Sequence, residues 1–382
     1  MEFVGGAIFG ALIGVLFTSL FQKYVDNKVE WAGRFTRGKI RKLLPSKVEQ
    51  PDKKFSIGDI VLEDCRLLDG IDSDYRVNIQ HSDEYVHLPD DLQKLSQDIK
   101  HQNEERERKG ERPIFQDLKP FGIKSLHFKR DEATGEHNVC IVRTLRSSFY
   151  NSLITKNLNT ILPDGQTVKA KYYDQIIDNP YELSPNNFNL IHALGVNILI
   201  ITKDNQAIIS KRNAQNVASS SGMYSISVCE HLNEEIVDFD INRTIQAKKV
   251  AKHGILQELG ITENEIIGDV KFFAVGFMPS LCHYEIIGMA YVSLDSNQIE
   301  ASIRNIAKDG SYEISKVEFV EFTLPEVVNF FKTTNLILTE WLVATLIICL
   351  QQQFSYMSFR EIAESFRGEF WKNSFKERVS KA

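Results

Sequence analysis

The sequence lacks the cysteine spacing of a metal or redox site. Its five cysteines are scattered and include no CxxC pair: Cys65, Cys140, Cys229, Cys282 and Cys349. This distribution argues against a structural zinc site. It suits a reducing cytosol, where each thiol is expected to be a small core residue.

The chain also lacks an excess of positive charge. Its 45 Lys and Arg residues stand against 51 Asp and Glu residues, for a net charge of −6. No bulk basic field attracts a nucleic acid polymer, so we expect no such partner. The densest charge run, residues 98–113, is predicted to be a solvated helix or linker.

Charge is missing altogether from residues 3–21, FVGGAIFGALIGVLFTSLF. A helix of this length just reaches across the roughly 30 Å hydrocarbon core of a bilayer, which predicts a transmembrane anchor over residues 1–24. A cleaved signal peptide and a buried soluble helix are the alternatives; a signal peptide would carry positive charge before the run. Gly6, Gly10 and Gly14 share one face of such a helix, so we expect helix packing there and a homo-oligomer.

Basic residues crowd the next segment, 25–50, which is expected to form a juxtamembrane helix at the lipid surface. Positive charge stays on the cytoplasmic side of a membrane, so the C-terminal bulk is predicted to be cytoplasmic. The sequence thus predicts a single-pass protein of the cell inner membrane, with membrane lipid as a partner.

The rest of the chain is predicted to have an α+β fold. Residues 51–185 mix short apolar runs with acidic turns and are expected to form a middle α+β module. Beyond residue 186, strands are expected at 194–202, 207–212, 270–278, 284–294 and 317–322, and helices at 244–259, from 325 and at 341–350. The last helix is too short to span a bilayer and is predicted to lie in the core, and residues 346–382 are assigned to a helical tail.

Residues 251–261, AKHGILQELGI, carry a family resemblance. They resemble the Nudix box, whose core reads Arg-Glu-apolar-x-Glu-Glu-x-Gly-apolar, and the surrounding order of strands and helices is similar to that of the Nudix fold. The resemblance implies a C-terminal Nudix-like α/β/α sandwich over residues 186–345 that binds a nucleotide. In the motif, glutamates three and four residues apart share one helix face and hold divalent metal against a pyrophosphate.

The box is degenerate in this chain. His253 stands in place of the arginine, and Gly254 and Gln257 replace two glutamates, whereas Glu258 agrees. One carboxylate does not hold the two or three Mg²⁺ ions of the family's chemistry, so we expect neither catalysis nor a cofactor. Under a hydrolase alternative, Glu258 would be the catalytic and metal-binding residue, with Mg²⁺ and an upstream acid such as Glu230.

Four residues are candidates for contacts with a nucleotide. Lys211 and Arg212 end a predicted strand where the resemblance puts phosphate or ribose contacts, and neighbours in a strand alternate faces, so one of the two is expected to point inward. Tyr224 and Phe273 are candidates for stacking on a base, with ordinary core packing as the alternative.

The whole layout is similar to that of the transmembrane–NUDIX effectors of bacterial CBASS systems, which signal phage infection through cyclic oligonucleotides. The resemblance implies a receptor that binds a cyclic oligonucleotide second messenger, oligomerises and disrupts the inner membrane in antiviral defence. Two alternatives stay open: a membrane-bound Nudix hydrolase of a nucleoside diphosphate derivative, and a membrane scaffold that binds no nucleotide.

Overall fold

The computed structural model describes residues 54–111, 119–130, 137–174, 176, 190–214, 221–237, 239–308, 310–354 and 359–380. Nearly all of them belong to one compact unit, which comprises residues 52–129 and 138–382. The predicted anchor with its three glycines, Gly6, Gly10 and Gly14, and the predicted juxtamembrane helix lie outside the described residues.

The prediction of a single-pass inner-membrane protein is contradicted within the described residues. Among the described residues, no helix is both long enough and apolar enough to cross a membrane. The apolar helix α10 (Glu340–Gln353) has 14 residues, or about 21 Å, well short of the roughly 30 Å of a bilayer core. Among the described residues the fold is α+β around a large mixed sheet, as the sequence predicts, but without a transmembrane helix.

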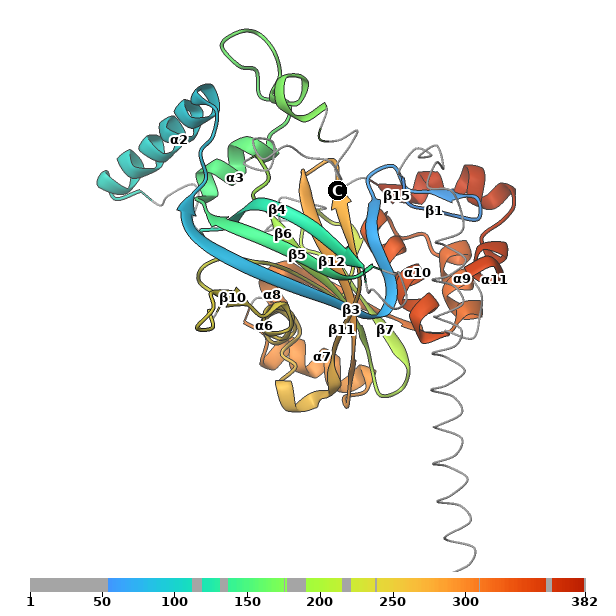
Figure 1. The fold of residues 1–382 in the computed structure, drawn as a ribbon. Helices are drawn as coiled ribbons and strands as arrows, with labels where there is room; N and C mark the ends of the chain where they lie inside the picture. Colours follow the sequence, from blue (N-terminus) through green and yellow to red (C-terminus); the bar gives the residue numbers. More distant parts are fainter. Residues whose placement is uncertain are drawn as a thin grey trace, which may run out of the picture. The chain divides into compact units, whose positions relative to one another are not determined.

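The described strands form one 13-stranded mixed sheet and a separate β1–β2 hairpin (Ser56–Ile57 and Ile60–Val61). The order along the sheet is β15-β14-β8-β7-β6-β12-β11-β3-β5-β4, with β9 on β6, β13 on β7 and β10 on β3 (Figure 1). Their bounds are β3 Arg66–Tyr85, β4 Phe121–Arg130, β5 His137–Arg146, β6 Leu194–Ile201, β7 Gln206–Arg212, β8 Tyr224–Ser225, β9 Val228–His231, β10 Thr244–Ile245, β11 Ile266–Met278, β12 His283–Val292, β13 Ile314–Glu321, β14 Leu338–Thr339 and β15 Val379–Ser380.

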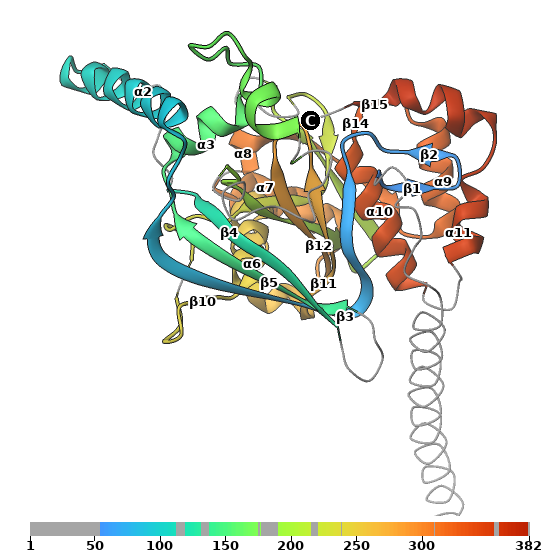
Figure 2. The same ribbon diagram turned by 45° about the horizontal axis from the view of Figure 1, so that its top comes forward.

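Helices cover both faces of this sheet (Figures 1 and 2). One face packs against α6 (Ala247–Leu259), and the other packs against α10. Strand β6, LGVNILII, is buried along its whole length, as expected for a central strand that is covered on both sides. It runs parallel to β12 and antiparallel to β9, so the centre of the sheet brings together segments that are far apart in the sequence.

Six further α-helices and four short helical segments are described. They are α2 Asp90–Arg108, α3 Phe149–Lys156, α7 Ser296–Asn305, α8 Gly310–Glu313, α9 Leu324–Thr333 and α11 Phe359–Ser365, with the π-helices Lys169–Tyr173 and Phe370–Ser374 and the 3₁₀ turns Glu263–Glu265 and Lys376–Arg378. Helix α6 ends at Gly260 in the left-handed conformation (φ 70°), as a glycine after the last helical turn predicts.

The sheet continues across the predicted limit between residues 185 and 186. Strand β3 is 20 residues long and pairs with β5 at one end and with β11 at the other. The predicted middle module and the predicted C-terminal sandwich therefore share one hydrogen-bonded sheet.

A buried histidine makes the stability of this sheet depend on pH. His81 of β3 is 8% exposed, lies between Phe121 and Phe239 with ring centroids 4.8 and 4.9 Å away, and has Nδ1 3.0 Å from Thr144 Oγ1. Burial, with Arg243 nearby, lowers the pKa of His81 to about 4. Between this value and the ordinary pKa of about 6.5, His81 binds a proton in the unfolded chain but not in the folded chain. Stability is therefore lost as the pH falls from about 6.5 to about 4.

We expect the melting temperature of His81→Phe to vary less with pH over this interval, because the phenyl ring stays uncharged in both the folded and the unfolded chain. His127→Phe, at an exposed position of β4, is the matched control and should keep the dependence of the unaltered protein. Thermal melts at several pH values measure both. If the melting temperature of His81→Phe falls with pH as steeply as that of the unaltered protein, the prediction is contradicted.

Candidate functional site

Glu258, the one glutamate of the Nudix-like motif that the chain retains, points into the protein interior. Glu258 of α6 is 6% exposed, and its Oε1 accepts a hydrogen bond from the backbone N–H of Cys229 on β9 at 3.1 Å. Burial raises the pKa of Glu258 well above its ordinary value, as do Glu313 and Glu230, whereas Arg212 opposes the shift. The carboxyl group thus ties the helix to the sheet.

Position 254, where the motif has its first glutamate, has no space for a side chain. A Cβ on Gly254 would lie 2.8 Å from Glu230 Cβ and 2.9 Å from Val228 Cγ1, closer than real Cβ contacts come. The Glu230 side chain fills this space, and its Oε2 lies 3.2 Å from Nδ1 of His253 on the same helix. The sequence does not show that Glu230 of β9 packs against α6, and the structure places it there.

These carboxyl groups do not gather into a metal site. In the part of the chain that the structure describes, Glu230, Glu258 and Glu313 do not bring ligand oxygens within 4.8 Å of one another as a group of three. Glu313 and Glu230 both lie close enough to Glu258 to raise the pKa of its carboxyl group, but the three do not place their oxygens around a common point where one ion could bind.

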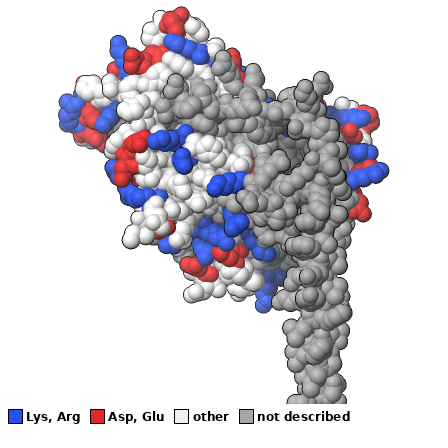
Figure 3. All heavy atoms as spheres, in the orientation of Figure 1, with Lys and Arg blue, Asp and Glu red and all other residues white. Residues whose placement is uncertain are grey.

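The two predicted cations at the end of β7 face opposite sides of the sheet. The side chain of Arg212 is 17% exposed, and its Nη2 lies 3.8 Å from Glu313 Oε2, beside α6. The Nζ of Lys211 lies 5.7 Å from the ring centroid of Tyr224, on the other side. Lys316 of β13 pairs in register with Lys211, so two lysines stand side by side at this end of the sheet. Figure 3 shows basic and acidic side chains interspersed in its view, without a broad basic face.

Both predicted stacking rings are covered. Phe273 is 2% exposed and belongs to the core under α10, and Tyr224 is 5% exposed. Core packing accounts for Phe273. The Tyr224 ring lies under Lys211, and its hydroxyl lies 3.4 Å from Glu318 Oε1.

A second polar cluster lies at the centre of the sheet. The Cys229 thiol, a ring nitrogen of His231 and a carboxylate oxygen of Glu285 lie within 4.8 Å of one another. Glu285 is 1% exposed, and His283 Nε2 lies 2.8 Å from its Oε1. Burial raises the pKa of Glu285 to about 7, with His231 and Lys156 acting in the opposite direction. Burial also lowers the pKa of His231 to about 3 and raises that of Cys229.

The sequence did not predict this cluster, because Cys229 belongs to no CxxC pair and to no other metal-site spacing. The signal that was available is the alternation of strands. Cys229-Glu230-His231 and His283-Tyr284-Glu285 are polar pairs two residues apart, and each pair projects to one face of its strand. The sequence does not show that the two strands are neighbours of β6, and that depends on the sheet order.

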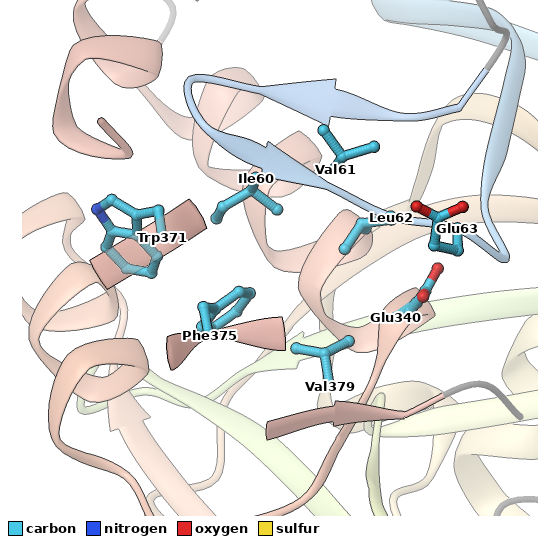
Figure 4. A pocket seen from close by; sticks show the side chains of 8 residues that line it. All are labelled: Ile60, Val61, Leu62, Glu63, Glu340, Trp371, Phe375 and Val379. Carbon is cyan, nitrogen blue, oxygen red and sulfur yellow. The ribbon is translucent and has the colours of Figure 1, made fainter. Parts of the chain in front are cut away.

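A small cavity opens between the β1–β2 hairpin and the C-terminal helices. It encloses about 170 Å³ and is lined by Ile60, Val61, Leu62, Glu63, Glu340, Trp371, Phe375 and Val379. Figure 4 shows the two carboxylates at one end and apolar side chains elsewhere. Pockets for small ligands usually hold about 300–1,000 Å³, so this one does not suit a nucleotide, and its carboxylates would repel phosphate.

No protein-family model and no curated protein matches the chain. Among solved structures, protein DR0079 from Deinococcus radiodurans aligns at 12% identity and a TM-score of 0.26, over 36% of this chain and 71% of its own. Tm1382, provisionally assigned as a Nudix hydrolase, aligns at 12% identity and 0.26, over 42% and 70%. A MutT protein from Methanosarcina mazei aligns at 17% identity and 0.23, over 36% and 80%. These likenesses are weak, and the fold assignment rests on the strands and helices of this chain itself.

Proposed function

We propose that the protein is a nucleotide receptor with a Nudix-like fold and without the metal-dependent hydrolysis of that family. The packing around Gly254 carries this proposal. The helix position that supplies the first metal-binding glutamate of a Nudix box has no room for a side chain, and the glutamate that remains, Glu258, is bonded to the sheet.

The arrangement of the chain supports the Nudix-like part of the proposal. The hairpin β6–β7, helix α6, hairpin β11–β12, strand β13 and helix α9 follow one another as the resemblance implies. They meet in a mixed sheet with α6 on one face and α10 on the other.

The ligand that we propose is a phosphodiester. Lys211 and Lys316 stand in register at one end of the sheet, and charge-assisted bonds from such side chains contribute about 1.5–3 kcal/mol each. The resemblance to CBASS effectors implies a cyclic di- or trinucleotide made after phage infection. We propose that this protein binds such a ligand, and we do not propose that it disrupts a membrane.

One observation favours the hydrolase alternative. Glu230 Oε2 would lie 3.3 Å from a Cβ on Gly254, so a carboxylate does occupy the neighbourhood of the missing glutamate. A Mg²⁺-dependent hydrolase of a nucleoside diphosphate derivative would use this group together with Glu258.

Magnesium dependence separates the two functions. We expect calorimetry to detect binding of a cyclic di- or trinucleotide in the presence of a chelator. We also expect turnover of nucleoside diphosphate derivatives to stay about 10²–10⁴-fold or more below that of a Nudix hydrolase, the usual loss when acid–base groups are missing. Robust hydrolysis that requires Mg²⁺ and disappears in Glu230→Gln would replace the receptor by the enzyme. A protein that neither binds nor hydrolyses any of these nucleotides would contradict both.

A further inference from the structure

The polar cluster at the centre of the sheet is assembled by three adjacent strands. His231 of β9 pairs with Gly195 of β6, and Gly195 pairs with Glu285 of β12. Cys229 lies two residues before His231, so both side chains project to the same face of β9. On β12, Glu285 shares its face with Ile287, which packs in the α10 layer, so the cluster lies on the side away from α6.

Gly195 makes the room that Glu285 occupies. A Cβ at Gly195 would lie 2.3 Å from Glu285 Oε2 and 2.9 Å from its Cδ. The carboxylate therefore lies directly over the backbone of the central strand, between its two neighbours. A residue with any side chain at position 195 would displace it.

The polar atoms of the cluster are buried without hydrogen bonds. Among the described residues, both carboxylate oxygens of Glu285, both ring nitrogens of His283 and Nε2 of His231 are buried and have no hydrogen-bond partner of acceptable geometry. Such groups are costly to bury, and in proteins they are satisfied by a partner, an ordered water or an ion. Glu285 and His283 are 1% and 2% exposed, so bulk water does not solvate them.

We infer that Cys229, His231 and Glu285 bind a divalent transition-metal ion, and that His283 positions the Glu285 carboxylate. Thiolate and imidazole ligands favour Zn²⁺ or Co²⁺ over Mg²⁺, which prefers oxygen ligands alone. Ligand atoms that bind one tetrahedral ion with bonds of roughly 2.0–2.3 Å lie about 3.3–3.8 Å from one another. The present separations of up to 4.8 Å would therefore shorten by about 1 Å when the ion binds. Binding releases the protons of the thiol and of the carboxyl group to solvent.

The ion would have three protein ligands and one position open to water or to a ligand group. His283 Nε2 lies 2.8 Å from Glu285 Oε1, close enough that a small rotation of either side chain would form a hydrogen bond and orient the carboxylate toward the ion, as residues behind a metal ligand commonly do. The competing cation is Lys156 at the end of α3, whose charge also interacts with Glu285 and Cys229. If its ammonium group alone compensates the carboxylate, no metal binds. Metal binding at this cluster is independent of the proposed nucleotide binding.

Cobalt titration of the metal-free full chain tests the inference directly. Because Co²⁺ bound to a thiolate absorbs in the near ultraviolet, we expect a charge-transfer band that saturates at one equivalent and is displaced by Zn²⁺. Cys229→Ser should abolish the band, whereas Cys349→Ala, which removes a buried cysteine outside the cluster, should leave it unchanged. His283→Gln should keep the band but weaken binding by about 10–100-fold.

Circular dichroism confirms that each variant is folded. In case Cys229→Ser does not fold, the melting temperature of the unaltered protein is a second measurement: Zn²⁺ should raise it, and should raise it far less in His231→Gln. The inference is overturned if the folded, unaltered protein gives no band with micromolar Co²⁺, if the band persists in Cys229→Ser, or if Zn²⁺ leaves the melting temperature unchanged.

Discussion

Gly254→Glu is expected to destabilise the protein rather than to give it Nudix activity. The new side chain would have to enter the space held by Glu230 and Val228, and its charge would lie near the buried Glu258. Overpacking of a core costs about 1–3 kcal/mol, and an uncompensated buried charge adds about as much again, so we expect a loss of at least about 3 kcal/mol. Urea denaturation measures the free energy of unfolding, and a magnesium-dependent turnover assay measures activity.

Gln257→Glu is the matched control for this substitution. It introduces the same side chain at the other degenerate glutamate position, which is half-buried, and should change stability by no more than about 0.5 kcal/mol. A Gly254→Glu protein of unchanged stability that hydrolyses nucleotides with Mg²⁺ would show that the helix face is still competent, and the receptor proposal would lose its main support.

Substitution of Arg212 is expected to lower stability, whereas substitution of Lys211 is expected to weaken ligand binding. Arg212 stands beside the buried Glu258 and beside Glu313, so its removal leaves the Glu313 carboxylate without its cation in a partly buried position. Removing one partner of a partly buried, charge-assisted contact costs about 1–3 kcal/mol, and we expect Arg212→Leu to lose about that much. Arg212→Lys should recover part of the loss, because the charge is restored without the planar guanidinium group.

Lys211→Ala should have the opposite profile. Its contact with the Tyr224 ring is worth about 0.5–1 kcal/mol at such a site, so the melting temperature should change little. If the lysine pair binds a phosphodiester, affinity for a cyclic dinucleotide should fall about tenfold or more. Affinity that is unchanged in both Lys211→Ala and Lys316→Ala, measured by calorimetry, would place the ligand elsewhere.

The order of elements after residue 186 could be predicted because each one carries a local signal. The buried strand β6 is a run of β-branched and apolar residues, Gly260 ends α6, and Pro325 lies in the first turn of α9. Alternation along a strand also predicted that Lys211 and Arg212 face opposite sides, and in the structure Lys211 lies over Tyr224 whereas Arg212 lies beside Glu313. These features depend on residues close together in the sequence.

The parts that could not be predicted depend on pairing between distant segments. Nothing local shows that β3 crosses from β5 to β11, or that β9 and β12 flank the same central strand. The Cys229 and Glu285 cluster exists only through that sheet order. The sequence does not show that Glu258 turns inward, because that depends on the position of the Cys229 amide on β9.

The length of β3 has a consequence for how the chain folds. Tyr75 pairs with Phe272, roughly two hundred residues further along, so the sheet is closed by contacts of very high sequence separation. Folding slows as such contact order rises, because the entropy of closing a long loop is lost before the pairing compensates for it. During synthesis β3 leaves the ribosome long before β11 exists, and its unpaired edge is open to wrong partners for that time. Slow refolding in vitro and a need for chaperones during expression are therefore expected of this chain.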